Sequence, residues 1–164
     1  MSEPRWLTPH EADVWAKYRR LRRELQRAQD LQLQRDSNIS GADYALLAPL
    51  SESAEGLLRA RDLGAEVGWE RSRLSHQISR MEKRGLVQRE PCPDDPRGSM
   101  VRLTQQGRQA IKAAAPRHVE TVRKLFFDPL SPGEVVLLGE MLERLLRAVD
   151  SHMTSDSDGN GVER

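Results

Sequence analysis

The chain has 164 residues, of which 37% are hydrophobic and 31% charged, and its formal net charge at pH 7 is +1. This length is sufficient for one globular domain with a core of its own. The sequence has no run of about 18 apolar residues, which excludes a transmembrane helix, and residues 1–6 lack the basic-then-apolar pattern of a signal peptide. We therefore expect a cytoplasmic protein with no membrane partner.

A long amphipathic helix is predicted near the N-terminus. Thr8 can cap it, Pro9 stands at its first position, and Glu11 can complete a capping box. Apolar side chains then recur at spacings of three and four residues as far as about Asp36, which predicts one continuous helix with a basic opposite face. The apolar positions are Val14, Tyr18, Leu21, Leu25 and Ala28.

Next in the chain, three further helices are predicted in close succession. Ser40 and Asp43 give a weaker capping signal for the first of them, and residues 61–67 form a short second one. Residues 70–83 carry apolar side chains on one side, and Gly85 suits the left-handed turn that follows a helix. The last two of these segments form a helix-turn-helix pair.

A β-hairpin is predicted directly after this pair, because the hydrophobic period changes from helical to two. Residues 86–89 and 99–103 have the pattern of short strands. Residues 90–98 between them include three prolines and a glycine, which predicts a long, stiff and exposed tip. Cys92 lies in this tip, so we expect a surface thiol without a redox role.

The C-terminal part returns to helical patterns from Thr104 onward. A last helix is predicted from Pro132 to about Asp150, and residues 151–164 are predicted to be a disordered polar tail. Residues 135–138 are apolar nearly all round this helix, which is more than a small domain can cover. We expect a partner subunit to cover these faces, and burial within the monomer is the alternative.

The predicted fourth helix carries the strongest functional signal. Its face opposite Leu74, Ile78 and Met81 is polar and cationic, as a helix that reads the DNA major groove requires. A solvated helix face is the alternative, but the preceding helix and the following hairpin with Arg97 favour a winged helix-turn-helix. The candidate DNA-binding residues on this helix are Ser72, Arg73, Ser75, His76, Ser79, Arg80 and Lys83.

The charge distribution agrees with a polyanionic partner. Residues 57–108 contain 11 basic and 7 acidic side chains, so this third of the chain has a net charge of +4, from 11 minus 7. A solvated surface of mixed charge would have a similar composition. The low net charge of the whole chain disfavours a non-specific architectural DNA-binding protein, which would depend on phosphate attraction alone.

Several motifs resemble those of the MarR family of transcriptional regulators. The most specific are Met81-Glu82-Lys83-Arg84-Gly85-Leu86-Val87, Asp95-Pro96-Arg97-Gly98 and Val101-Arg102-Leu103-Thr104 with Gly107 after it. Asp43-Tyr44 and residues 127–131 add to the resemblance, which extends from about Leu7 to Val149. In one respect the chain departs from the pattern, because Trp69-Glu70 stands where the family usually has a Ser or Thr cap.

The resemblance implies a mainly α fold with a small β-hairpin wing. It implies one domain over residues 1–150, in which dimerisation helices at 7–36 and 104–150 flank a winged helix-turn-helix lobe at 40–103. It further implies a homodimer that binds the two halves of a palindromic operator in double-stranded DNA, most often as a repressor. In that arrangement Arg97 enters the minor groove and Asp95 positions it.

The family commonly binds small aromatic effectors between the dimer base and the DNA-binding lobe. Trp15, Tyr18 and Tyr44 are candidates to line such a site, although aromatic residues at helical spacing are more often part of a core. The sequence has no catalytic motif, so we expect neither an enzyme nor a cofactor. A metal site is not expected, because the four histidines lie on different predicted elements, at His10, His76, His118 and His152. A winged-helix protein-interaction module without DNA binding is the alternative function.

Overall fold

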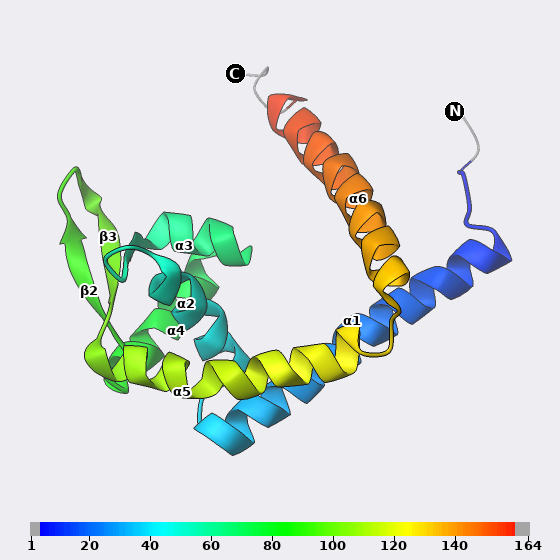
Figure 1. The fold of residues 1–164 in the computed structure, drawn as a ribbon. Coiled ribbons are helices and arrows are strands. Elements are labelled where there is room, and N and C mark those ends of the chain that lie inside the picture. The colour runs from blue at the N-terminus through cyan, green and yellow to red at the C-terminus, as the bar shows by residue number, and fades with distance from the viewer. Residues whose placement is uncertain (1–3, 160–164) are drawn as a thin grey trace. The chain divides into compact units, whose positions relative to one another are not determined.

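The computed structural model describes residues 4–159, which form a mainly helical fold with one small sheet (Figure 1). Two compact units make up the chain, Met1–Thr121 and Val122–Arg164. The predicted fold class is confirmed. The boundaries of a single domain over residues 1–150 remain a prediction.

The helices of the first unit begin where the sequence predicts. They are α1 (Pro9–Ser37), α2 (Gly41–Glu52), α3 (Ala60–Val67), α4 (Arg71–Lys83) and α5 (Gln105–Val122). Thr8 Oγ1 accepts from the Glu11 backbone N–H at 3.3 Å, and the Glu11 carboxylate accepts from the Thr8 N–H at 2.7 Å. Ser40 and Asp43 make the same reciprocal pair at the start of α2. Both predicted capping boxes are therefore confirmed.

A three-stranded antiparallel sheet forms the wing, with the order β1-β3-β2. The strands are β1 (Leu57–Arg59), β2 (Val87–Cys92) and β3 (Asp95–Leu103). The sequence did not predict β1, because three residues are too few to show an alternating pattern. The strands also extend further than predicted, and only residues 93 and 94 form the turn. Pro91 is tolerated because β2 is an edge strand.

The core of this unit lies between α2, α3, α4 and the sheet. Its least exposed apolar side chains come from all four parts, and Leu47, Leu63, Met81 and Val101 have no solvent exposure. The apolar stripe predicted for α4 is confirmed, since Leu74 and Ile78 are also buried. This packing leaves the opposite face of α4 free of the core.

A buried carboxylate fixes α4 against α2. Asp43 is 1% exposed and accepts from Gln77 Nε2 at 2.7 Å and from Arg84 Nη1 at 2.6 Å. Arg84 also donates to the Asn38 carbonyl at 2.8 Å. Because Gln77 lies in the middle of α4 and Arg84 at its C-cap, the network sets both the position and the rotation of α4.

The start of α5 is pressed against the segment that follows α4. Gly85 has the predicted left-handed conformation, with φ at +71°. Thr104 Oγ1 donates between the carbonyls of Gly85 and Leu86, at 2.6 and 3.0 Å. A Cβ at Gly107 would lie 2.0 Å from the Leu86 carbonyl oxygen, so only glycine allows this approach.

The second unit consists of a π-helical turn, Arg123–Phe127, and the helix α6 (Pro132–Gly159). A capping box starts α6, since the Ser131 N–H donates to the Glu134 carboxylate at 2.7 Å and Ser131 Oγ accepts from the Glu134 N–H. The helix continues past its predicted end near Asp150, so the prediction of a disordered tail is wrong for residues 151–159. Their helix propensities are low, but extension of an existing helix needs no new nucleus, so these residues can continue α6. Residues 160–164 lie outside the described part.

Many apolar side chains of both units are exposed in the single chain. On α6 they include Val136, Leu137, Leu145, Leu146 and Val149, each more than half exposed. On α1 and just before it, Trp6, Leu7, Val14 and Trp15 are also more than half exposed. No described helix is both long and apolar enough to cross a membrane.

Candidate nucleic-acid interface

The exposed face of α4 matches the face predicted from the sequence. Ser72, Arg73, Ser75, His76, Arg80 and Lys83 are exposed, whereas Ser79 is half-buried. Gln77 lies on the buried side and is only 3% exposed. A continuous polar and cationic surface therefore runs the length of this helix.

Arg80 is held in place by the buried network described above. Its Nη2 donates to Gln77 Oε1 at 2.5 Å, and Gln77 in turn donates to Asp43. A guanidinium that is fixed in this way loses less conformational entropy when it binds a base edge. The sequence indicated Arg80 as a candidate but did not indicate the two residues that position it.

Arg89 on β2 connects the wing to α4. Its guanidinium forms an ion pair with the Glu82 carboxylate and donates to the Ser75 carbonyl at 2.9 Å and to Ser79 Oγ at 3.1 Å. The Ser79 hydroxyl thus already has a partner within the chain. Sequence reasoning missed Arg89, because its partners lie on another element and no local pattern relates them.

The first turn of α4 differs from the usual capped start. Glu70 occupies the N-cap position but makes no side-chain capping bond. The Arg73 guanidinium lies over the Trp69 ring, 4.2 Å from its centroid, as in a cation–π contact. Trp69 therefore orients Arg73 toward one flank of α4, while Ser75 lies on the opposite flank beside Arg89.

The wing presents Arg97 to solvent near its tip. The Arg97 backbone N–H donates to Asp95 Oδ1 at 2.9 Å, so Asp95 shapes the backbone that carries Arg97. The Arg97 guanidinium has no hydrogen bond or ion pair with any residue between 4 and 159. Cys92, which was predicted to be exposed, is 7% exposed, and that prediction is wrong. The reason is that β2 extends to residue 92 and pairs it with Asp95 across the hairpin.

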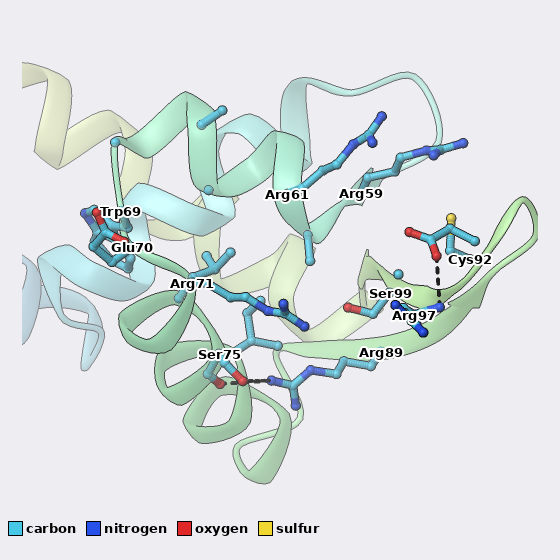
Figure 2. Close-up of a pocket in the computed structure, with 18 residues that line it drawn as sticks. Arg59, Arg61, Trp69, Glu70, Arg71, Ser75, Arg89, Cys92, Arg97 and Ser99 are labelled. Atoms are coloured by element: carbon cyan, nitrogen blue, oxygen red, sulfur yellow. Dashed lines mark hydrogen bonds between the residues drawn. The ribbon is translucent and has the colours of Figure 1, made fainter. Parts of the chain in front are cut away.

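A hollow of about 670 Å³ separates α3 and the start of α4 from the wing. Figure 2 shows arginines around it that come from five different elements. They are Arg59, Arg61, Arg71, Arg89 and Arg97. Sequence reasoning singled out only Arg97 among them, although the basic composition of residues 57–108 was a signal for the others.

The three candidate effector residues are not brought together in the single chain. Trp15 and Tyr18 stack on each other at 5.3 Å between ring centroids and are about half exposed. Tyr44 instead packs against His118 of α5, at 4.1 Å. Burial raises the pKa of Tyr44 and lowers the pKa of His118, whose Nδ1 is buried without a hydrogen-bond partner among the described residues.

A second hollow lies beside Trp69 and Arg73, with walls from α1 and α2. None of Trp15, Tyr18 and Tyr44 lines it. Within residues 4–159 no group of three or more His, Cys, Asp and Glu side chains has an arrangement that could hold a metal ion. The arginine-lined surface of α4 and the wing is therefore the strongest candidate for a functional site among the described residues.

Comparisons with known proteins identify transcriptional regulators that are similar to this chain. A model of the MarR family matches residues 37–98. The uncharacterized HTH-type transcriptional regulator YxaD of Bacillus subtilis is 30% identical, over 70% of this chain and 78% of that protein. The crystal structure of Sco3205, a MarR family transcriptional regulator from Streptomyces coelicolor in complex with DNA, is 40% identical with a TM-score of 0.84, and the match covers 90% of this chain and 92% of that one. PcaV of the same organism, solved in complex with its natural ligand, is 28% identical with a TM-score of 0.65, over 79% of this chain and 91% of PcaV.

Proposed function

Because this chain belongs to the MarR family of transcriptional regulators, which are not enzymes, we propose that it is a homodimeric repressor of a pseudo-palindromic operator in the cytoplasm. Two α4 helices read the major groove at the two half-sites, and two wings contact the neighbouring minor groove. The observation that carries this proposal is the polar face of α4, on which the Gln77–Asp43 network holds the Arg80 guanidinium.

Each candidate residue has a role that follows from its chemistry. Ser72, His76 and Arg80 are exposed on the central face of α4 and contact base edges, and Lys83 contacts phosphate. Arg97 enters the minor groove, where the negative potential is strongest over narrow A·T-rich sequence. Arg73 and Ser75 contact the backbone on the two flanks of the helix. The similar protein Sco3205, crystallised with DNA, supports this assignment as a whole.

Dimerisation follows from the apolar side chains that the single chain leaves in water. Full burial of a Val, Leu or Met side chain contributes about 1.5–3 kcal/mol, so the exposed residues of α6 alone give a large driving force for association. Exposed apolar patches of this kind mark protein–protein interfaces. We therefore assign α6 and the N-terminal part of α1 to the dimer interface.

Release from DNA by a small aromatic effector completes the proposal. Trp15 and Tyr18 offer an exposed stacked pair of rings, whereas the Tyr44 ring is already covered by His118. An aromatic ligand gains stacking contacts on such a pair. The similar protein PcaV, solved with its natural ligand, supports an effector in this family member too.

The test is to select bound duplexes from a random pool and to measure their affinities at fixed salt. We expect a two-fold symmetric consensus, with half-site centres about 10 base pairs apart, and much weaker binding to one half-site. Equal affinity for the half-site and the full site would contradict the palindrome. Binding to no duplex would favour a protein-interaction module instead.

A further inference from the structure

The hollow between α4 and the wing lies where a DNA strand has to pass. When a helix occupies the major groove and a wing the adjacent minor groove, the one phosphodiester strand between the two grooves must cross the gap between the two elements. In this chain that gap is the hollow of about 670 Å³ with five arginines on its walls. Against these five arginines the lining has two carboxylates, Glu70 and Asp95, so its net charge is positive, as a site for a strand of phosphates requires.

The five arginines differ in how firmly their guanidinium groups are held. Arg71 and Arg97 have no ion-pair or hydrogen-bond partner for the guanidinium in the described part of the chain, and Arg61 pairs with its exposed neighbour Asp62 at 3.1 Å. Arg89 is locked between Glu82 and two serines. Arg59 lies between these extremes, because a single carboxylate from the tip of the wing holds it.

That carboxylate belongs to Asp94, whose Oδ2 accepts from Arg59 Nη2 at 2.7 Å. The Asp94 side chain is 74% exposed and the Arg59 side chain is 31% exposed. Ion pairs this accessible to water contribute little to stability. A phosphate can therefore replace the carboxylate at low cost, and arginine binds phosphate through two parallel hydrogen bonds.

From these observations, and on the basis of the DNA binding proposed above, we propose that Asp94 is a phosphate mimic at the wing tip. In the free protein it neutralises Arg59. On binding, a backbone phosphate in the hollow takes its place, and the tip of the wing is released toward the minor groove. A carboxylate that stayed beside the incoming phosphate would instead repel it.

The exchange predicts opposite effects for its two members. Asp94→Asn removes the competitor, so we expect about two- to fivefold tighter binding with an unchanged salt dependence. Arg59→Gln removes a phosphate contact, so we expect about tenfold weaker binding and a slope of log K against log salt that is smaller by about one. Because phosphate carries no sequence information, each fold-change should be the same on the selected duplex and on an unrelated duplex of equal length.

The double variant with Arg59→Gln and Asp94→Asn distinguishes the proposed exchange from a general effect of removing a negative charge. In the Arg59→Gln background, Asp94→Asn should leave the affinity nearly unchanged, because the residue for which Asp94 competes is gone. Glu55→Gln is the matched control, since it removes the same charge from an exposed turn residue of the same lobe, outside the helices assigned to the dimer interface and outside the walls of the hollow, and should not tighten binding. Thermal unfolding of all variants checks that each one is folded.

The measurement is fluorescence anisotropy of labelled duplexes at several salt concentrations. The exchange is refuted if Asp94→Asn tightens binding equally in both backgrounds, or if Arg59→Gln leaves the salt slope unchanged. Either result leaves the proposed function intact as long as the wild-type chain still prefers the selected duplex. If the wild-type chain shows no preference for the selected duplex, the proposed function itself is overturned.

Discussion

The two elements of the winged lobe that we propose to contact DNA are anchored in opposite ways. The helix α4 is fixed on its buried side by Asp43, which is 1% exposed and accepts hydrogen bonds from Gln77 and Arg84. The tip of the wing is held by the exposed pair of Arg59 and Asp94. A buried network specifies one geometry, whereas an exposed pair is readily exchanged. For the proposed DNA binding, this difference predicts a preorganised α4 beside a wing tip that can adapt its contacts.

The largest expected effect comes from breaking the buried anchor. Asp43→Asn leaves Arg84 without its counter-charge and one polar group of the network unsatisfied, so we expect a loss of about 3 kcal/mol in the free energy of unfolding. Asp94→Asn, its exposed counterpart, should cost less than about 1 kcal/mol. Urea unfolding of both variants measures the difference. Equal losses would show that the two anchors are energetically alike.

A second effect separates the two elements by the DNA positions that they read. Arg97→Ala should weaken operator binding by about 1–3 kcal/mol and relax the preference at the outer, A·T-rich positions. Arg80→Ala should cost a similar amount but relax the preference at inner, major-groove positions. Affinities over a panel of duplexes with single base-pair changes distinguish these patterns. A wing that contributes nothing would give Arg97→Ala the wild-type profile on every duplex.

A smaller effect is expected at the exposed C-terminal end of α4. Lys83→Ala should weaken binding to all duplexes alike and reduce the salt slope by about one, because a lysine contributes a point charge near phosphate. Lys112→Ala on α5 is an exposed control that removes the same charge. Titrations at several salt concentrations measure both. A change in base preference for Lys83→Ala would place this side chain in the groove.

The smallest effect lies where α5 packs on α2, the helix that also carries the anchor of α4. Burial lowers the pKa of His118 in the folded chain, while the unfolded chain keeps a value of about 6.5. As the pH falls below about 6.5, the unfolded state binds more protons, so the free energy of unfolding decreases. His118→Gln should reduce this decrease, and His10→Gln on α1 should not. Urea unfolding between pH 5 and 8 tests the prediction. If the free energy of unfolding of the wild type and of His118→Gln depends on pH in the same way, the prediction is wrong.

What the sequence predicted well was local. The starts of α1 and α2 follow from Thr8 with Glu11 and from Ser40 with Asp43, residues only three positions apart. What it missed depends on segments far apart in the chain. Arg84 reaches Asp43 across 41 positions, and Arg59 reaches Asp94 across 35, so no periodicity or motif could relate them. The burial of Cys92 was missed for the same reason, because it depends on how far the two strands of the hairpin stay paired.

The glycine at position 107 has a mechanical consequence. Its lack of a side chain brings the first turn of α5 against the Leu86 carbonyl, and Thr104 and Gln106 add hydrogen bonds to residues 84–86. At Gly107 no side chain separates the backbone of α5 from the Leu86 carbonyl, which lies just after α4. We therefore expect the first turn of α5 and the segment that follows α4 to move together. A displacement of the first turn of α5 would then also shift α4, the helix proposed to read the operator.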